Sequence, residues 1–436
     1  MTCEDWQNLG LCLEVSRMDE KIRKPQVRFE GFEDDWEQRK LGEVVQIKDS
    51  ARIPNELWTN AGVPYIRASD LSNNDLTGVL FLSKDTFETY RKQTGAPVKG
   101  DVLFNGGGEI GKAVIYENIE SMYVQGGAVL YARTSDSKFI CSSYLKSYFE
   151  TCYSRKYIER SAVGGTMKHF TLQPALKMPI EFPTMMEQEK IGMFFTNLDN
   201  LITLHQRKYE KLQNVKKSML EKMFPKNGMK VPKIRFEGFT DDWEQRKLKE
   251  LLNRKAEKNS NGSYTQDDVL ACSLGTELDK KTIFFGLRST EESVKSYRIV
   301  DLGDVIYTKS PIKGFPNGIV RTCKNVDGIV PSLYCVYGKN NDSSISLDSR
   351  FIQSYLEDKT RLDQYLYPLV NVGARNNVNI SDKEFLEGEI LLPSKLEEQN
   401  KIVDCLEKIT NLITLHQRKV EKLQNIKKSC LEKMFV

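Results

Sequence analysis

The feature that most constrains this chain is an internal duplication. Residues 200–224 and 411–435 are identical at 22 of 25 positions, and residues 28–41 and 235–248 differ at only one of 14. The segments between these repeats have largely unrelated side chains. A repeated framework around two different inserts predicts a scaffold that carries two different recognition surfaces.

Both copies of the longer repeat lie in amphipathic helical patterns. Apolar residues recur at three- and four-residue spacing from Ile191 to Met223 and from Ile402 to Met434, with a near-heptad seam. Each helix is predicted to run for about 37 residues, or about 55 Å. Because two like units can pack about a two-fold axis, we expect the helices to be antiparallel, with the C-terminus returning towards the first insert.

The two inserts follow the same course. Apolar runs broken by glycine predict strands and tight turns at 101–131 and 303–338, and helical patterns follow at 141–160 and 349–368. We therefore predict an α+β protein with pseudo-two-fold symmetry. Two similar mixed α/β domains are separated by two long helices that form an antiparallel coiled coil.

The predicted domain boundaries follow from these patterns. They are an N-terminal extension at 1–24, a first recognition domain at 25–185, a first helix at 186–226, a second recognition domain at 227–395 and a second helix at 396–436. The first 17 residues have no counterpart before the second repeat. They are either dispensable or form a short N-terminal helix.

Composition excludes several classes of protein. The net charge of +4 gives no argument for nucleic acid by itself. Nine scattered cysteines without a CxxC pair disfavour zinc ribbons and dithiol redox sites, and with no secretory signal they favour the cytoplasm. No apolar run is long enough to span a membrane. His205 and His416 occupy equivalent seam positions without further ligands nearby, so we expect no metal site.

The framework motifs resemble those of one family. Three motifs occur in the same order in both halves and lead into the long helices: Asp35-Trp36 and Asp242-Trp243, then Gly100-Asp101 and Gly303-Asp304, then Glu187-Gln188 and Glu398-Gln399. From about residue 25 onwards, this layout resembles the specificity subunit of Type I restriction–modification enzymes.

The resemblance implies a non-catalytic protein that binds double-stranded DNA. Each of the two target-recognition domains would contact half of a split site, and the helices would set the gap between the halves. Implied partners are modification subunits, expected to be two, and ATP-dependent restriction subunits, with no membrane partner. This chain is expected to bind no cofactor itself; S-adenosylmethionine, ATP and Mg are implied for the partner subunits.

The DNA-binding candidates lie in loops that mix basic, polar and small residues. Arg and Lys can hydrogen-bond to guanine, and Asn or Gln to adenine, in the major groove. The candidates are Arg67, Ser69, Asn105, Lys112, Thr166, Lys168, His169, Thr308, Lys309, Ser310, Lys313, Arg375, Asn376 and Asn377. The loops at 105–109 and 309–315 depart from the family pattern, so the sequence that each half recognises cannot be transferred.

Two other functional classes remain open at this point. Residues 106–112 match the spacing of a phosphate-binding loop, but the following Ala113-Val114-Ile115-Tyr116 is typical of a strand, whereas such a loop requires a helix. A nucleotide-dependent enzyme is therefore disfavoured. A coiled-coil scaffold whose inserts bind proteins is the stronger alternative. We expect Trp36 and Trp243 to be core residues, and we identify no catalytic residue.

Overall fold

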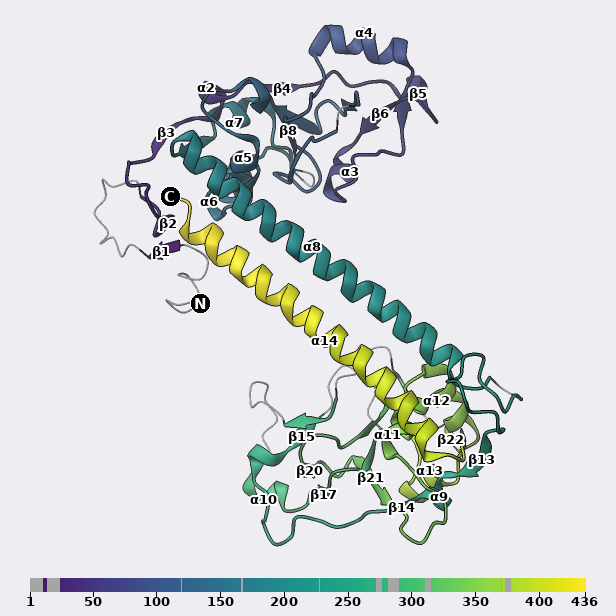
Figure 1. The fold of residues 1–436 in the computed structure, drawn as a ribbon. Coiled ribbons are helices and arrows are strands. Elements are labelled where there is room, and N and C mark those ends of the chain that lie inside the picture. The colour runs from purple at the N-terminus through teal and green to yellow at the C-terminus, as the bar shows by residue number, and fades with distance from the viewer. Residues whose placement is uncertain are drawn as a thin grey trace. The chain divides into compact units, whose positions relative to one another are not determined.

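The computed structural model describes residues 11–13, 24–118, 120–165, 168–226, 228–271, 277–280, 290–309, 315–369, 371–372 and 378–436. The chain forms two compact units, and each unit contains one end of both long helices (Figure 1). Unit 1 comprises residues 1–206 and 417–436, and unit 2 comprises residues 207–416.

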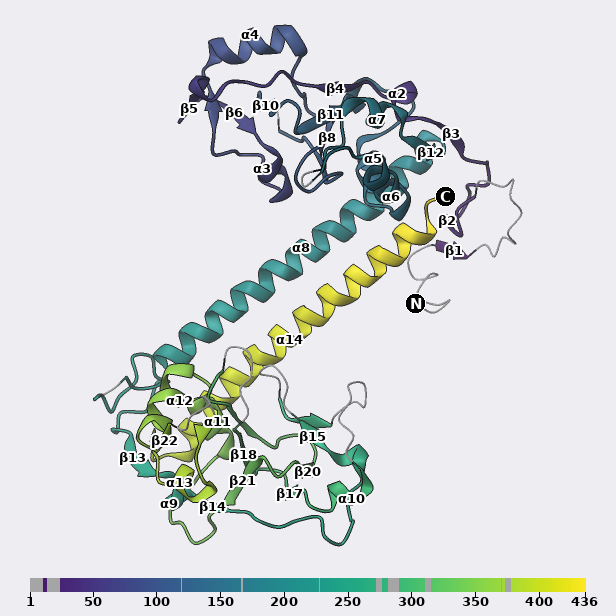
Figure 2. The same ribbon diagram turned by 180° about the vertical axis from the view of Figure 1, so that it is seen from behind.

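The two long helices match the sequence prediction closely. α8 spans Met185–Lys222 and α14 spans Leu396–Lys433, with 38 residues each. In unit 1 the C-terminal turns of α14 lie beside the N-terminal half of α8 in both views (Figure 2). Phe195 contacts Phe435 at a ring distance of 5.8 Å, and Asp199 pairs with Lys427 at 2.5 Å. Residue numbers rise along one helix as they fall along the other, so the predicted antiparallel packing is confirmed.

Unit 2 contains the opposite ends of the same helices. Leu220, near the end of α8, and Phe224, just after it, share a hydrophobic core with Ile402 and Leu406 near the start of α14. Each recognition domain is therefore closed by the C-terminal turns of the helix that belongs to the other repeat. The predicted return of the C-terminus to the first insert is confirmed.

Unit 1 is built on a four-stranded antiparallel sheet in the order β4-β11-β8-β9, and a second sheet has the order β10-β6-β7-β5. Its helices are α2 (Leu41–Val44), α3 (Ala68–Ser72), α4 (Lys84–Thr94), α5 (Ser142–Phe149), α6 (Cys152–Ser161) and α7 (Leu172–Lys177). Its strands are β1 (Leu11–Leu13), β2 (Val27–Phe29), β3 (Glu37–Lys40), β4 (Ile47–Asp49), β5 (Trp58–Thr59), β6 (Val63–Ile66), β7 (Phe81–Leu82), β8 (Val102–Asn105), β9 (Ala113–Ile115), β10 (Tyr123–Val124), β11 (Val129–Ala132) and β12 (Pro179–Phe182).

Unit 2 repeats the first of these sheets. Its four antiparallel strands have the order β14-β21-β18-β19, which is the same connectivity along the chain. Its helices are α9 (Leu248–Leu251), α10 (Glu291–Val294), α11 (Ser349–Leu356), α12 (Lys359–Leu366) and α13 (Asp382–Leu386). Its strands are β13 (Glu244–Lys247), β14 (Leu252–Arg254), β15 (Leu270–Ala271), β16 (Asp279–Lys280), β17 (Arg298–Val300), β18 (Val305–Thr308), β19 (Ile319–Thr322), β20 (Gly328–Val330), β21 (Tyr334–Lys339), β22 (Asn371–Val372), β23 (Val378–Asn379) and β24 (Glu389–Leu392).

The repeated sequences form equivalent contacts at the base of each insert. β3 pairs with β12 in unit 1, and β13 pairs with β24 in unit 2, so each insert begins and ends on neighbouring strands.

The described part of the N-terminal segment differs from the short helix that was one of the two expectations for it. Its described residues, Leu11–Leu13, form a strand that pairs with β2, and the rest of residues 1–17 lies outside the described part of the chain.

The repeated tryptophans are core residues, as predicted. Trp36 is 3% exposed and packs against Phe435 at a ring distance of 6.2 Å. Trp243 is 1% exposed and packs against Phe224 at 6.0 Å. Because the phenylalanine just after each long helix packs on the tryptophan of the unit that the helix closes, each Trp-Phe pair joins a helix end to an insert base. Burial of such large rings supplies much of the stabilisation at each junction.

Candidate nucleic-acid interface

A buried ion pair fixes each insert to its helix. Arg28 donates through Nε and Nη2 to the two carboxylate oxygens of Glu187, at 2.7 and 2.8 Å, inside unit 1. Arg235 binds Glu398 in the same way in unit 2, at 2.7 and 2.9 Å. This two-point geometry fixes orientation as well as distance. The glutamates identified as family motifs are therefore framework residues.

The adjacent glutamines complete the framework. Gln188 donates to the carbonyls of Phe139 and Pro183 at 2.7 and 2.9 Å and accepts from the backbone of Cys141 at 3.1 Å. Gln399 makes the equivalent bonds to Ser346, Pro393 and Asp348, each at 3.0 Å. Both side chains satisfy backbone groups that would otherwise be buried without partners. The start of each long helix is thus bonded to the segment that leads into α5 or α11.

The Gly-Asp motifs hold the turns that lead into β8 and β18. Gly100 and Gly303 have positive φ angles of 95° and 91°, a backbone region that favours glycine. Asp101 accepts from the Val98 N–H at 2.9 Å, and Asp304 accepts from the Asp301 N–H at 2.8 Å. Burial raises the pKa of both carboxyls. These residues position the two strands that lead into candidate DNA-facing loops.

The glycine-rich segment 106–111 connects β8 to β9 in an antiparallel hairpin. The residues that follow it form a strand, as predicted, and not the helix that a phosphate-binding loop requires. Its backbone N–H groups at Gly106 and Gly107 both donate to the carbonyl of Ala128. These two N–H groups are therefore engaged within the fold and are not available to a phosphate.

Three loops of unit 1 that carry candidates lie against one another. The Asn105 amide donates to the Ala68 carbonyl and to Ser72 Oγ, each at 2.9 Å, which joins the end of β8 to α3. The Phe170 N–H donates to the Gly106 carbonyl at 2.7 Å, and the His169 ring lies 3.3 Å from the position of a Cβ on Gly107. The structure therefore brings together the segments at 67–72, 105–112 and 168–170.

The candidates in these loops differ in accessibility. Ser69 and Lys168 are exposed, and Arg67, Lys112 and His169 are partly exposed. Asn105 is fully buried, so its side chain holds the loop in place and is not available to contact a base in this conformation. Thr166 lies outside the described residues.

In unit 2 only two candidates fall within the described residues. Thr308 is buried, and its Oγ1 accepts from the Ile319 N–H at 3.3 Å, so it closes the base of the hairpin between β18 and β19. Lys309 is partly exposed, with Nζ 3.7 Å from Asp382. Ser310, Lys313, Arg375, Asn376 and Asn377 lie outside the described residues.

Unit 2 contains a cationic cluster that the sequence did not predict. Arg254 from β14 and Arg298 from β17 both bind Asp382 at the start of α13, at 3.0 and 2.7 Å, and Lys309 lies on the same carboxylate. Asp382 has a lowered pKa: burial acts to raise it, but hydrogen bonds from Cys335 and Arg254 and the nearby Arg298 outweigh that effect. No local pattern marks these residues, because Arg254 and Asp382 are 128 positions apart.

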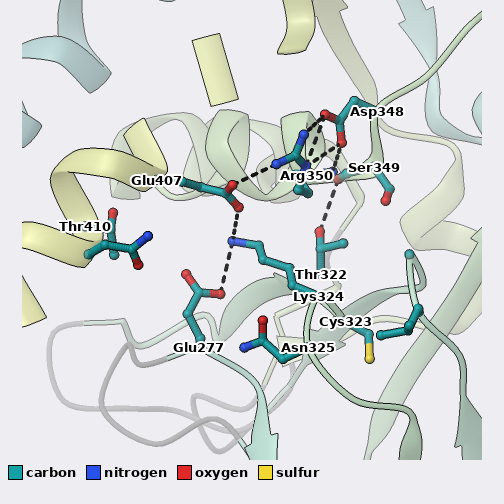
Figure 3. A pocket seen from close by; sticks show the side chains of 13 residues that line it. Glu277, Thr322, Cys323, Lys324, Asn325, Asp348, Ser349, Arg350, Glu407 and Thr410 are labelled. Carbon is teal, nitrogen blue, oxygen red and sulfur yellow. Dashed lines mark hydrogen bonds and ion pairs between the residues drawn. The ribbon is translucent and has the colours of Figure 1, made fainter. Parts of the chain in front are cut away.

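Unit 2 also contains a cavity of about 520 Å³ between α14, α11 and the segment after β19 (Figure 3). Lys324 lies between Glu277 and Glu407, at 3.2 and 2.9 Å. Arg350 binds Glu407 and Asp348, each at 2.7 Å. Both cations are thus paired with carboxylates in the cavity wall, and neither is left to attract an anion. The cavity is therefore a weaker candidate for a charged ligand than the loops.

The described part of the chain lacks two further features. No group of three or more His, Cys, Asp or Glu side chains has an arrangement that could hold a metal ion there. Within the same residues, no helix is both long and apolar enough to cross a membrane.

Comparisons with known proteins agree with the duplicated architecture. Residues 33–214 match the family described as "Type I restriction modification DNA specificity domain". The MjaX type I restriction enzyme specificity subunit of Methanocaldococcus jannaschii is similar, with 24% identity over 91% of this chain and 92% of the relative. The MjaVIII specificity subunit of the same organism is 24% identical over 65% of this chain and 67% of the relative.

A solved structure has the same fold. It is the S subunit of the Type I restriction–modification system from M. genitalium, with a TM-score of 0.62 and 13% identity over 95% of this chain and 99% of that one. The family match covers the first insert and much of α8, and the relatives extend the likeness over both inserts. Taken with the duplicated framework, these matches support the identification of the chain as a Type I restriction–modification specificity subunit.

Proposed function

We propose that this specificity subunit recognises a two-part DNA sequence, with the insert of each unit contacting one half. The observation that carries the proposal is the convergence in unit 1 of α3, the 105–112 hairpin loop and residues 168–170, the segments that carry Arg67, Ser69, Lys112, Lys168 and His169. Such a mixture of cationic and hydrogen-bonding side chains suits phosphate and base contacts. The domain division at 25–185, 186–226, 227–395 and 396–436 remains our working assignment.

Specificity subunits are the non-catalytic members of these systems, and catalysis belongs to separate modification and restriction subunits. We propose that the chain joins these subunits to double-stranded DNA. In the assembly, S-adenosylmethionine would serve methyl transfer, while ATP and Mg would serve the restriction subunit. No observation in the described residues favours the alternative of a scaffold that does not bind DNA.

Methylation mapping tests the recognition of a split site. We expect a host that expresses this chain with its modification subunit to methylate one sequence made of two short halves separated by a fixed gap. A duplex with that sequence should bind the complex at least about 10³-fold more tightly than random duplex. Its affinity should fall steeply with salt because phosphate contacts release counterions. An affinity that depends on neither the DNA sequence nor the salt concentration would favour the alternative of a protein-binding scaffold.

Equivalent exposed leucines suggest how two modification subunits dock. Leu201 and Leu204 on α8 in unit 1 are 44% and 46% exposed. Their repeat counterparts on α14 in unit 2, Leu412 and Leu415, have the same values. Apolar residues three apart on one helix form a small patch suited to a partner helix. Because the patch is present once in each unit, we propose that each unit binds one modification subunit.

Charge substitution in one patch should remove one partner. We expect Leu201→Lys/Leu204→Lys to change the complex from two modification subunits to one, and the fourfold variant to bind none. Native mass spectrometry of the purified complex measures this stoichiometry. Met193→Lys is the matched control, since Met193 is 63% exposed on α8 but its repeat counterpart is Asp404. Two bound subunits in the fourfold variant would exclude these patches as the docking sites.

A further inference from the structure

Arg67 is held in one orientation by Asp70. Its Nε donates to Asp70 Oδ2 at 3.0 Å, and its Nη2 donates to Oδ1 at 2.9 Å. Asp70 also accepts from the Arg67 backbone N–H at 2.9 Å, so it caps the start of α3 as it holds the guanidinium. The Asp70 side chain is 8% exposed, whereas the Arg67 side chain is 32% exposed. A buried carboxylate therefore presents a partly exposed arginine.

This arrangement leaves one edge of the guanidinium available. A guanidinium has five N–H groups, and Asp70 uses one on Nε and one on Nη2. The Nη1 atom has no partner among the described residues, so Nη1 and the second hydrogen of Nη2 form an intact two-donor edge. Two parallel donors match the O6 and N7 acceptors that guanine presents in the major groove.

The same pairing disfavours a phosphate as the ligand of this arginine. The Asp70 carboxylate cancels most of the charge that would attract a phosphate, which is the main source of sequence-independent binding. It leaves the hydrogen-bonding edge unchanged and removes rotamer freedom before DNA binds. Fixed geometry with little net charge suits a base edge better than a backbone anion.

The position of Arg67 agrees with this assignment. It immediately precedes Ala68, whose carbonyl accepts from the Asn105 amide, and the Ala68 Cβ lies 4.0 Å from the position of a Cβ on Gly108. The residue thus stands at the junction of α3 with the hairpin loop, where the candidate loops of unit 1 meet.

We propose that Arg67 recognises a guanine in the half-site contacted by unit 1, and that Asp70 is the positioning residue that aims it. The inference rests on the proposed function and deepens it, because it assigns one base to one side chain. It predicts that one position of one half-site is a G·C pair whose identity depends on Arg67.

The test uses the complete methyltransferase complex and two readouts. The first is the methylated sequence in the host genome, and the second is binding to four duplexes that differ only at the assigned base pair. We expect Arg67→Ala to make that single position degenerate, with discrimination against the other base pairs falling by roughly 10- to 100-fold. Asp70→Asn, which keeps an acceptor for the Arg67 N–H, should relax the same position to a smaller extent.

Arg91→Ala is the matched control, because Arg91 also pairs with an acid three residues away, Glu88, but lies on α4 outside the candidate loops. The control should leave the methylated sequence unchanged. An unchanged sequence in Arg67→Ala would overturn the inference, as would equal weakening on all four duplexes, which indicates a phosphate contact. Either result leaves the proposed function intact. Absence of any split methylated sequence with the unmodified protein would instead refute the proposed function.

Discussion

Exchanging residues 249–387 for the second insert of another specificity subunit should change one half of the recognised sequence and preserve the other half. The structure supplies suitable junctions, since the Leu248 N–H donates to the Gly388 carbonyl at 2.9 Å. The exchanged segment therefore starts and ends at hydrogen-bonded neighbours. β13 and β24, which lie outside the exchange, keep their four-residue antiparallel register from Glu244 to Lys247.

The donor insert must reproduce one part of the core. Phe351 and Tyr355 from the exchanged segment pack on Phe224 at ring distances of 5.6 and 5.8 Å. A donor with aromatic residues at these two positions preserves the packing of α8, and a donor without them loses stability for reasons unrelated to DNA. Methylation mapping measures the outcome. A change in both halves would contradict separate recognition by the two inserts.

Breaking the buried ion pair of unit 1 should cause the largest loss of stability. Arg28 and Glu187 have side chains that are 5% and 0% exposed. Replacing only one partner leaves an uncompensated charge in the interior, which costs about 3–5 kcal/mol. We expect Glu187→Ala and Arg28→Met to lower the free energy of unfolding by that amount, measured by urea titration followed by circular dichroism.

Two controls separate this effect from the general loss of a salt bridge. Glu37→Ala removes the carboxylate of an exposed pair with Arg39, and it should cost about 1 kcal/mol or less. The double variant Arg28→Met/Glu187→Leu removes both buried charges and should recover most of the stability, because an apolar pair of similar size avoids the desolvation cost. A double variant as unstable as either single one would show that packing, and not charge, explains the loss.

Local periodicity was sufficient to predict the long helices. The apolar spacing from Ile191 to Met223 gave a length of about 37 residues, against 38 in the structure, because helical exposure repeats every 3.6 residues. The strand after the 106–111 loop followed in the same way from the apolar run at Ala113-Val114-Ile115-Tyr116. The duplication also predicted that the contacts at the base of one insert recur at the base of the other.

Contacts between distant residues could not be predicted in this way. Asn105 and Thr308 have the composition of loop residues but are buried, because α3 covers the first and the β19 backbone bonds the second. The Arg67–Asp70 pair is local in sequence, yet its significance depends on the hairpin loop that lies against Ala68.

The sequence by itself determined the duplication, the two helices, their antiparallel pairing and the core role of Trp36 and Trp243, since these follow from repetition and short-range periodicity. Only the tertiary structure decided which polar residues are framework and which remain available to a ligand. Arg28 and Glu187 are 159 positions apart, and Arg235 and Glu398 are 163 apart. Burial and charge pairing at such separations arise only when the chain has folded, so no local pattern records them.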